Sequence, residues 1–371
     1  MTNTSTIFDL ALKGVQQLIP YTPGKPIDEL KRELNLRKIV KLASNESPLG
    51  INPTITQAIT KVLPELSRYP DGSGFNLKTA LSKKLSVGIE QITLGNGSND
   101  LLEIITRTFV NPDLEIIYSQ HAFAVYPIVT QAVGATARVI PAKNYGHDLE
   151  AMLNAVNNKT RLVFIANPNN PTGTLLKPEA IKAFISALPK TVLCVLDEAY
   201  FEFIADDKRA DSISGLSEFP NLIITRTFSK AYGLAGLRIG YSLSSPEIAD
   251  LLNRVRQPFN NNVLALVAAE TALADEKYLQ LAVETNNKGM KQLTTAFEFL
   301  DLKWIPSAGN FVSIDFKQPA MPIYEALLQK GVIVRPVGGI YEMPNHLRIS
   351  IGTEKENQFF INSLKTSLTD I

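Results

Sequence analysis

Between about residue 88 and residue 245, short apolar runs alternate with segments of helical periodicity. In the segment 177–188, apolar side chains recur at the i, i+3, i+4 and i+7 positions of one helix face. The runs 192–197 and 221–225 are continuously apolar, as is typical of strands that are buried on both faces, and the run 161–166 is also predicted to be a strand. Further strands are predicted at 91–94, 115–118 and 137–140. This alternation predicts an α/β fold in which helices flank a mainly parallel sheet.

The pattern changes after about residue 245. A long helical stretch at about 261–298 contains no proline, and shorter strand and helix patterns follow it, which favours a smaller α+β domain. The proline-rich piece 18–27 cannot lie in the middle of a helix or of a central strand, so we expect an arm that crosses the surface. The expected division is an arm with part of the small domain at 1–40, a large domain at 41–255 and a small domain at 256–371.

Composition narrows the possible partners. The chain has 371 residues, and its 37 basic and 36 acidic side chains leave a net charge of +1, which argues against nucleic acid or an anionic membrane as the main partner. The single cysteine, Cys194, excludes a disulfide framework within the chain. No secretory signal pattern and no stretch of 18 uncharged apolar residues occurs, so we expect a soluble, cytoplasmic protein.

Several kinds of chemistry find no support in the sequence. The three histidines are scattered, so no metal site is expected. There is no G-x-S-x-G, H-E-x-x-H or Walker A motif. An enzyme with this sequence would take its reactivity from an organic cofactor.

Polar side chains follow three successive predicted strands. Asn170 lies after the strand at 161–166, Asp197 ends the next strand, and Lys230 follows the third. Because ligands of open α/β sheets bind beyond the carboxyl ends of the strands, these three side chains could converge in one crevice. Plainer readings remain open: Asn170 as a turn residue, Asp197 as a helix N-cap, and Tyr200 as a core residue.

Lys230 lies in the segment TFSKAYGLAGLR, residues 227–238. Thr227, Ser229 and Arg238 would suit a bound phosphate, and a lysine beside a phosphate suggests a Schiff base to a phosphorylated aldehyde. The alternative is a solvated lysine at the start of a helix. The turn GNGSND (95–100) could hold the same phosphate with its backbone N–H groups and Ser98, or it could simply provide an N-cap through Ser98 or Asn99.

Together the motifs NNPTG (169–173), DEAY (197–200) and SK with an arginine at Arg238 resemble the aspartate-aminotransferase superfamily, the fold-type I enzymes that depend on pyridoxal 5′-phosphate (PLP). The resemblance implies a large PLP-binding domain, with Lys230 as the covalent attachment point and Asp197 as the partner of the pyridine nitrogen. It also implies that Asn170 and Tyr200 bind the phenolic oxygen and that Phe123, or less favourably Tyr126, stacks on the ring. The implied phosphate ligands are Ser98, Asn99, Thr227, Ser229 and Arg238.

The resemblance also implies a homodimer with shared active sites, because Tyr69 of RYPDG (68–72) looks like the tyrosine that reaches the cofactor phosphate of the neighbouring chain. Within the superfamily, PYTPGKP (20–26), LASNESPLG (42–50), VIVRPV (332–337) and LRISIG (347–352) are most similar to the histidinol-phosphate aminotransferases. The substrate-binding residues implied by this similarity are Arg348, Arg335, Asn45 and Tyr21, the last from the partner's arm. Salt bridges for the two arginines and a structural role for Tyr21 remain open.

The implied reaction transfers the amino group of L-glutamate to imidazole acetol phosphate and gives L-histidinol phosphate and 2-oxoglutarate, a step of histidine biosynthesis. Aromatic aminotransferases and threonine-phosphate decarboxylases share most of these motifs and remain alternatives. A further alternative is a regulator with the same fold that turns nothing over.

Overall fold

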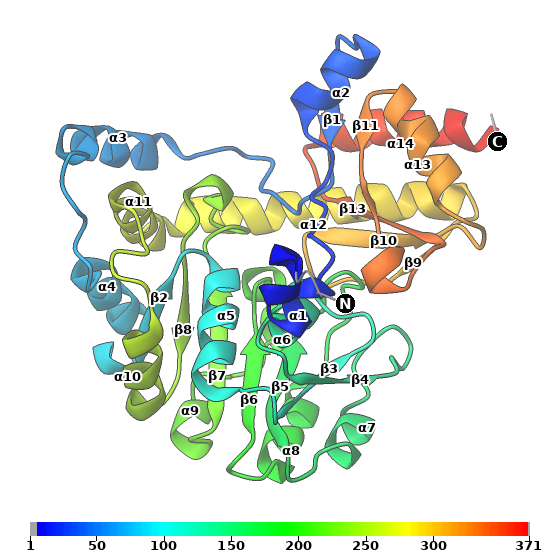
Figure 1. The fold of residues 1–371 in the computed structure, drawn as a ribbon. Helices are drawn as coiled ribbons and strands as arrows, with labels where there is room; N and C mark the ends of the chain where they lie inside the picture. The colour runs from blue at the N-terminus through cyan, green and yellow to red at the C-terminus, as the bar shows by residue number, and fades with distance from the viewer. Residues whose placement is uncertain (1–5, 370–371) are drawn as a thin grey trace.

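A seven-stranded sheet forms the centre of the large part of the molecule in the computed structural model, which describes residues 6–369 (Figure 1). All of its strands run parallel except β8, which is antiparallel to both of its neighbours. The predicted α/β fold is therefore confirmed. The strand order across the sheet is β2 (Ile92–Gly95), β8 (Gly240–Leu243), β7 (Leu222–Thr227), β6 (Leu193–Asp197), β5 (Thr160–Ala166), β3 (Glu115–Ser119) and β4 (Thr136–Ile140).

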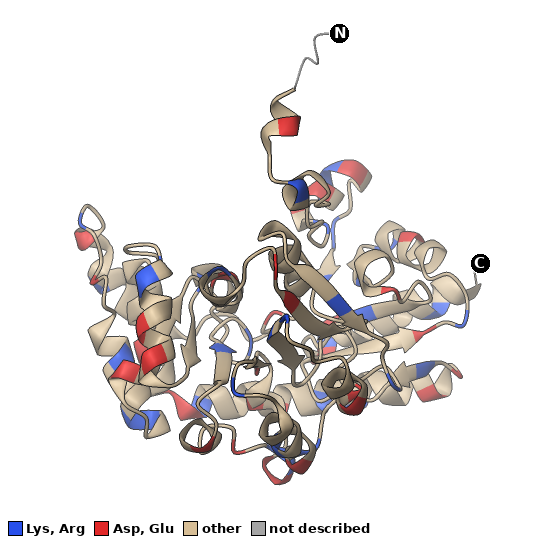
Figure 2. Cartoon of the chain, turned by 60° about the horizontal axis from the view of Figure 1, so that its bottom comes forward, with Lys and Arg blue, Asp and Glu red and all other residues tan. Residues whose placement is uncertain are grey.

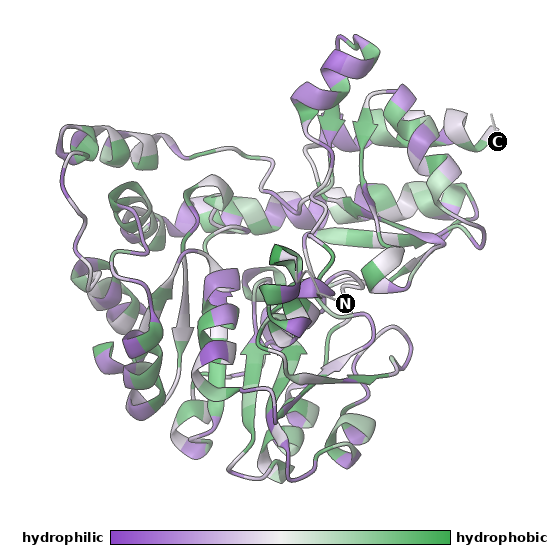
Figure 3. Cartoon of the chain, viewed as in Figure 1, coloured by the Kyte–Doolittle hydropathy of each residue, from purple (hydrophilic) through white to green (hydrophobic). Residues whose placement is uncertain are grey.

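Helices cover both faces of this sheet. Successive residues of β5 point to opposite faces, so Val163 joins one apolar cluster and Phe164 joins the other. The central strands β5 and β6 are coloured mainly as hydrophobic in Figure 3, whereas the outer helices carry purple, hydrophilic positions. The cluster of Phe164 contains side chains from α5 (Ser98–Phe109), α6 (Val125–Ala132) and α10 (Pro246–Val255). The cluster of Val163 contains side chains from α3 (Pro53–Val62), α4 (Phe75–Leu85), α7 (Leu149–Asn154), α8 (Pro178–Ala187), α9 (Gly215–Glu218) and α11 (Val263–Leu273). The short helix α1 (Lys13–Gln16) contacts α6.

The smaller part contains a four-stranded antiparallel sheet with its own apolar core. Its strand order is β12 (Arg335–Pro336), β13 (His346–Ser350), β10 (Phe311–Asp315) and β9 (Lys303–Ile305). The accompanying helices are α12 (Glu276–Phe299), α13 (Met321–Gln329) and α14 (Glu354–Thr369). A short parallel pair, β1 (Val40–Lys41) with β11 (Val332–Ile333), attaches the chain that follows α2 (Ile27–Leu34) to this part.

The structure differs from the sequence-based expectation at three places. The long helical stretch at about 261–298 is two helices, because the side chain of Asp275 accepts a hydrogen bond from Tyr278 N and starts α12 as its N-cap. The helix α11 packs into the core of the large sheet, so the packing places it there and not in a small domain that begins at residue 256. The run 332–337 is divided between β11 and β12, which belong to different sheets.

Charged residues of both signs are interspersed on the outer helices (Figure 2). Most ion pairs of the described residues have at least one exposed partner, and in the pair between Lys182 and Glu218 both side chains are exposed, by 63% and 50%. The pair between Arg226 and Glu198 is different, because both side chains are buried and the nitrogen–oxygen distance is 2.7 Å. Within residues 6–369, no helix combines the length and the apolar character needed to cross a membrane.

The buried pair and the exposed pair should differ strongly in their contribution to stability. Replacement of Glu198 by alanine leaves the Arg226 guanidinium buried without its carboxylate, which costs about 3–5 kcal/mol. The matched change Glu218→Ala removes an exposed partner and costs at most about 1 kcal/mol. Thermal unfolding of the two variants measures the difference, and equal shifts in melting temperature would contradict this account.

Candidate active site

A cavity of about 190 Å³ lies at the carboxyl ends of the central strands, where residues of the small part close over them. Fourteen of the residues singled out from the sequence line it, and Tyr69 does not. The predicted convergence of Asn170, Asp197 and Lys230 is therefore confirmed. The fourteen are Tyr21, Asn45, Ser98, Asn99, Phe123, Asn170, Asp197, Tyr200, Thr227, Ser229, Lys230, Arg238, Arg335 and Arg348.

Asp197 is a buried carboxylate that forms no ion pair with any residue in 6–369. Its Oδ1 accepts a hydrogen bond from Thr225 Oγ1 at 3.1 Å, and its Oδ2 accepts one from the Tyr126 hydroxyl at 2.9 Å. Burial raises the pKa of Asp197 to about 6, although these hydrogen bonds act in the opposite direction. The N-cap reading of Asp197 is wrong, because the next helical turn, at 201–203, has Tyr200 at its N-cap position.

Tyr126 holds Asp197 and does not stack in the cavity. Its ring lies against Phe164, with 4.4 Å between the ring centroids and an interplanar angle of 3°. Phe123, which lines the cavity, meets Tyr126 edge-on. Of the two aromatic candidates, only Phe123 is placed where it could contact a bound ring, so the alternative of Tyr126 as the stacking residue is wrong.

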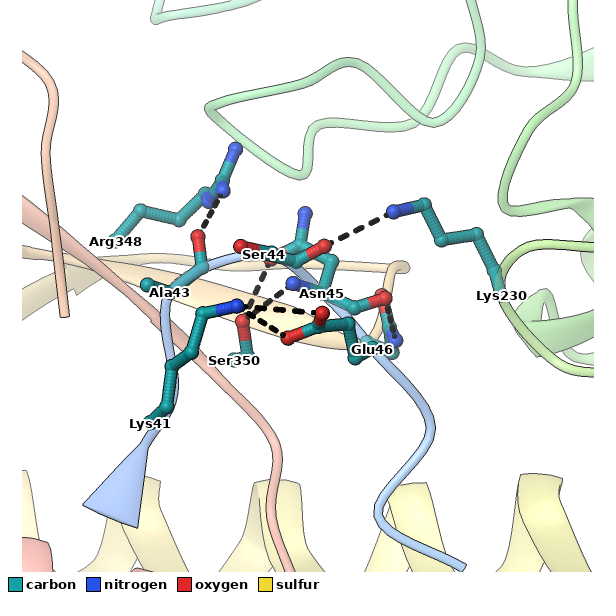
Figure 4. A network of polar contacts seen from close by, with 9 residues as sticks. Lys41, Ala43, Ser44, Asn45, Glu46, Lys230, Arg348 and Ser350 are labelled. Atoms are coloured by element: carbon teal, nitrogen blue, oxygen red, sulfur yellow. Dashed lines mark hydrogen bonds and ion pairs between the residues drawn. The ribbon is translucent and has the colours of Figure 1, made fainter. Parts of the chain in front are cut away.

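Lys230 follows β7 in an irregular segment, so it is not a solvated lysine at the start of a helix. Its Nζ donates a hydrogen bond to the carbonyl of Ser44 at 3.0 Å (Figure 4). Burial, together with the positive charge of Arg348, lowers the pKa of the amine to about 7. A substantial fraction of Lys230 is therefore the neutral, nucleophilic amine at neutral pH.

Tyr200 receives two amide hydrogen bonds at its hydroxyl oxygen. Asn45 Nδ2 donates at 2.9 Å and Asn170 Nδ2 donates at 3.1 Å. Asn45 is itself held in a left-handed conformation, with φ of 55°, by hydrogen bonds with Ser350. Burial raises the pKa of Tyr200 to about 12, so its hydroxyl keeps its proton and can donate to a ligand in the cavity.

Arg348 reaches the cavity from β13. Its guanidinium donates to Asn170 Oδ1 at 2.5 Å and to the carbonyl of Ala43 at 2.7 Å, and its Nε has no partner within the described residues. No carboxylate pairs with it among residues 6–369, so the salt-bridge reading is wrong. This buried arginine is positioned to bind an anion with the donors that it still has free.

Arg335 and Tyr21 lie together at the same cavity. Arg335 is the direct neighbour of Arg348 in the β12–β13 pairing, and its Nη1 donates to the carbonyl of Thr22 at 2.8 Å. The guanidinium also lies over the ring of Tyr21, 5.2 Å from its centroid. The sequence-based expectation took this tyrosine from the partner's arm. In the structure the chain's own arm carries Tyr21 to the cavity, because Arg335 binds it there.

The residues predicted to hold a phosphate form one group. Arg238 Nη1 donates to Ser229 Oγ at 3.1 Å, and Thr227 Oγ1 accepts from Ser229 N at the same distance. The antiparallel strand β8 begins at Gly240, two residues after Arg238, and Gly240 pairs with Thr227 at the end of β7, which brings this arginine to the carboxyl ends of the parallel strands. The helix α5 begins at Ser98 with Gly97 as its N-cap, so the reading of Ser98 or Asn99 as a side-chain N-cap is wrong.

Gly240 allows the residues predicted to hold a phosphate to lie close together. A Cβ atom at Gly240 would lie 2.7 Å from Ser98 N and 2.9 Å from the carbonyl of Arg226. Only glycine therefore permits β8 to lie so close to the start of α5. The result is a cradle with backbone donors from a helix N-terminus, hydroxyl groups and a guanidinium, which together suit a phosphate dianion.

Tyr69 lies outside the cavity of its own chain and is 82% exposed. Three functional residues were not predicted from the sequence. Tyr126 orients Asp197, Ser44 receives the Lys230 hydrogen bond, and Tyr341 is a buried residue of the cavity wall. Tyr126 was considered only for stacking; Ser44 lies in the motif LASNESPLG, from which only Asn45 was assigned a role, and no motif marks Tyr341.

The donor set fits the cofactor that the sequence resemblance implies. PLP has a phosphate, an aldehyde, a phenolic oxygen and a ring nitrogen that is basic. The cradle at Arg238 suits the phosphate, the neutral amine of Lys230 suits the aldehyde, and the unpaired carboxylate of Asp197 suits the ring nitrogen when that is protonated.

The raised pKa of Asp197 has a consequence for stability. The carboxyl group of Asp197 binds its proton more tightly in the folded protein than in the unfolded chain. Its contribution to the free energy of unfolding is therefore fully present below a pH of about 3.8 and is lost as the pH rises through about 6. Ionisation of this carboxylate costs on the order of 3 kcal/mol at pH 8. Asp197→Asn removes that cost and should stabilise the ligand-free protein, by on the order of 1 kcal/mol more at pH 8 than at pH 5.

Urea unfolding of the ligand-free variant and wild type at both pH values measures this difference. Asp250→Asn, on the exposed face of α10, is the matched control and should show no comparable change between the two pH values. If Asp197→Asn changes the free energy of unfolding equally at pH 8 and at pH 5, burial does not raise the pKa of this carboxyl group.

The chain is similar to known proteins over almost its whole length. The family model described as aminotransferase class I and II matches residues 37–364. Histidinol-phosphate aminotransferase 2 of Pseudomonas fluorescens (strain Pf0-1) is 56% identical over 97% of both chains, and histidinol-phosphate aminotransferase 1 of Nitrosococcus oceani is 56% identical over 99% of both.

Among solved structures, histidinol-phosphate aminotransferase of Sinorhizobium meliloti in complex with PLP has a TM-score of 0.90 and is 31% identical, covering 96% of this chain and 97% of that one. The cavity therefore lies in a fold that binds PLP in a relative. With this agreement of sequence and structure, the chain belongs to the histidinol-phosphate aminotransferase family of the class I and II aminotransferases.

Proposed function

We propose that this protein is a PLP-dependent aminotransferase that converts L-glutamate and imidazole acetol phosphate into 2-oxoglutarate and L-histidinol phosphate, a step of histidine biosynthesis. The observation that carries this function is the cavity, where a lysine of lowered pKa, an unpaired carboxylate, a phosphate cradle and two arginines meet. The 56% identity to histidinol-phosphate aminotransferases over nearly the whole chain supports the same substrate class.

PLP, when bound, supplies a ring that accepts the electron pair left at the substrate Cα when a proton is removed. The Nζ of Lys230 takes up that proton and returns it, and a pKa of about 7 suits an amine that acts as both base and acid near neutral pH. Asp197 keeps the ring nitrogen protonated through its negative charge, and Tyr126 and Thr225 hold the carboxylate in place.

Tyr200 and Asn170 bind the phenolic oxygen in this proposal. The Tyr200 hydroxyl receives both amide groups at its oxygen, so its own proton remains available for donation to the ring oxygen. Asn170 also accepts from Arg348, which connects this part of the site to the arginine that binds substrate.

Arg348 binds the α-carboxylate of glutamate, and Arg335 with Tyr21 binds the phosphate of the second substrate. Arg335 and Arg348 are paired positions of β12 and β13 and both line the cavity, which suits a phosphate dianion because it is best neutralised by more than one cation. Arg348 binds both substrates in this proposal: the α-carboxylate of glutamate in one half of the reaction and the phosphate of histidinol phosphate in the other.

The active protein is a homodimer in this proposal, with Tyr69 of each chain directed to the phosphate cradle of the other. Two observations support it. Tyr69 is strongly exposed and lies outside its own cavity, and Leu63, Leu66 and Phe75 nearby in the chain are also exposed apolar side chains.

Lys230→Ala should lower kcat for transamination by at least about 10³-fold, because the proton transfer at the substrate Cα loses its base. Lys182→Ala, an exposed lysine of α8, is the control and should keep wild-type turnover. The assay follows 2-oxoglutarate formed from L-glutamate. Wild-type turnover in the Lys230 variant, or no turnover in the wild type with this substrate pair, would overturn the proposal. A preference for phenylalanine, or carbon dioxide release from threonine phosphate, would replace it with the corresponding activity.

Arg335→Leu and Arg348→Leu should separate the two anion contacts. Loss of Arg335 should raise KM for histidinol phosphate about tenfold or more, with little change in the half-reaction with glutamate, because only the phosphorylated substrate uses this side chain. Loss of Arg348 should impair both half-reactions. Single-turnover kinetics with each substrate measure the two effects, with Arg254→Leu on the surface of α10 as the control. An equal effect of Arg335→Leu on glutamate would contradict the assignment.

A further inference from the structure

Tyr69 is held by a stacking contact although it is largely exposed. Its ring centroid lies 4.7 Å from that of Phe259, and the planes are inclined by 22°. Tyr69 is 82% exposed and Phe259 is 45% exposed. Since so exposed a pair buries little apolar area, the stack contributes little to the folding free energy, and its main effect is to fix the orientation of the Tyr69 ring.

The backbone of Phe259 is in a conformation that is costly for a bulky residue. Its φ angle is 55°, in the left-handed region. The packing against the Tyr69 segment is also close, because a Cβ atom at Gly72 would lie 3.2 Å from two atoms of the Phe259 ring. Arg256 adds a second attachment by donating from Nη2 to the carbonyl of Gly72 at 2.7 Å. The loop 256–262 therefore binds the Tyr69 segment at two points.

The same loop also binds the phosphate cradle of its own chain. The contacts are side-chain hydrogen bonds from three consecutive asparagines: Asn260 Nδ2 to Asp100 Oδ2 at 2.8 Å, Asn261 Nδ2 to the carbonyl of Gly95 at 2.7 Å, and Asn262 Nδ2 to the carbonyl of Leu237 at 3.2 Å. Gly95 and Asp100 belong to the turn that opens α5, and Leu237 precedes Arg238. This one loop thus joins both sides of the cradle to the segment that carries Tyr69.

We propose that the loop 256–262 is a positioning loop, in which Phe259 orients Tyr69 for the cofactor phosphate of the partner chain. This inference rests on the proposed homodimer with Tyr69 acting between chains. The anchors at the chain's own cradle fix the place from which Tyr69 extends, and the stack with Phe259 fixes its direction. Phe259 is a positioning residue in this role, since it acts through Tyr69 and needs no contact with cofactor or substrate.

A double-mutant cycle on cofactor affinity tests the inference. The ligand-free protein and its Tyr69→Phe, Phe259→Ala and doubly substituted variants are titrated with PLP and with pyridoxal, which lacks the phosphate. Tyr69→Phe removes a hydroxyl donor to the phosphate and should weaken PLP binding about tenfold. Phe259→Ala should weaken it about three- to tenfold. The double variant should be no weaker than Tyr69→Phe, and pyridoxal should bind all four proteins equally.

Two further variants separate positioning from a purely structural role. Phe259→Tyr keeps a ring that can stack and should keep the PLP affinity of the wild type, whereas Phe299→Ala removes an exposed aromatic of α12 and should change nothing. Additive losses in the double variant, or an equal loss of pyridoxal affinity in Phe259→Ala, would overturn the role of Phe259. If Tyr69→Phe has no effect on PLP affinity, the shared site of the proposed dimer is itself wrong, and the inference fails with it.

Discussion

The burial of one carboxylate without a counter-ion is the constraint around which this site is built. Asp197 is at the end of β6, where the sheet and its helices exclude water. Two hydroxyl groups, from Tyr126 and Thr225, bind its oxygens, and neither of them neutralises its charge. An ionised carboxylate in such surroundings raises the free energy of the folded protein unless a cation is bound beside it. Asp197 therefore lowers the stability of the ligand-free protein. In the proposed function, a protonated ring nitrogen would supply that cation, and the cofactor would bind at the place where the ligand-free protein carries an uncompensated buried charge.

The other parts of the site follow from how the two parts of the molecule meet. The large sheet contributes the cavity residues that are proposed to hold the cofactor, from the ends of β5, β6 and β7 and from the segment before β8. The small sheet contributes Arg335 and Arg348, which line the same cavity and are proposed to bind substrate. The segment 41–46 lies between them and contacts both, because Ser44 accepts from Lys230 and Ala43 accepts from Arg348 (Figure 4). Asn45 extends this link by binding Tyr200 on one side and Ser350 on the other.

The sequence predicted the convergence of the site because strand patterns are local and the carboxyl ends of parallel strands meet at one edge. Asn170, Asp197 and Lys230 could be placed by that rule alone. Tyr126 could not be assigned to Asp197 in this way, because their contact spans 71 positions and depends on how α6 packs on the sheet. Ser44 presents a backbone carbonyl to Lys230, and a backbone group leaves no mark in a sequence.

For the fold, the sequence predicted the positions of the strands but not the direction of β8, the break between two helices or the course of the arm. Apolar runs located the strands of the large sheet, but the antiparallel direction of β8 follows from the course of the irregular connection 228–239 between β7 and β8, which periodicity does not report. The break between α11 and α12 depends on a single cap at Asp275 within a stretch of good helix formers. The course of the arm was the least predictable part, because the contacts of Tyr21 and Thr22 with Arg335 join positions that are far apart in the chain.

The central claim is that Asp197 is buried in order to meet a cationic ring nitrogen. The most direct measurement compares the affinity of the ligand-free protein for PLP with its affinity for the analogue in which the ring nitrogen is replaced by a C–H group. The account predicts that PLP binds at least about tenfold more tightly, because only PLP offers Asp197 a charged hydrogen-bond donor. Equal affinity for the two compounds would contradict it.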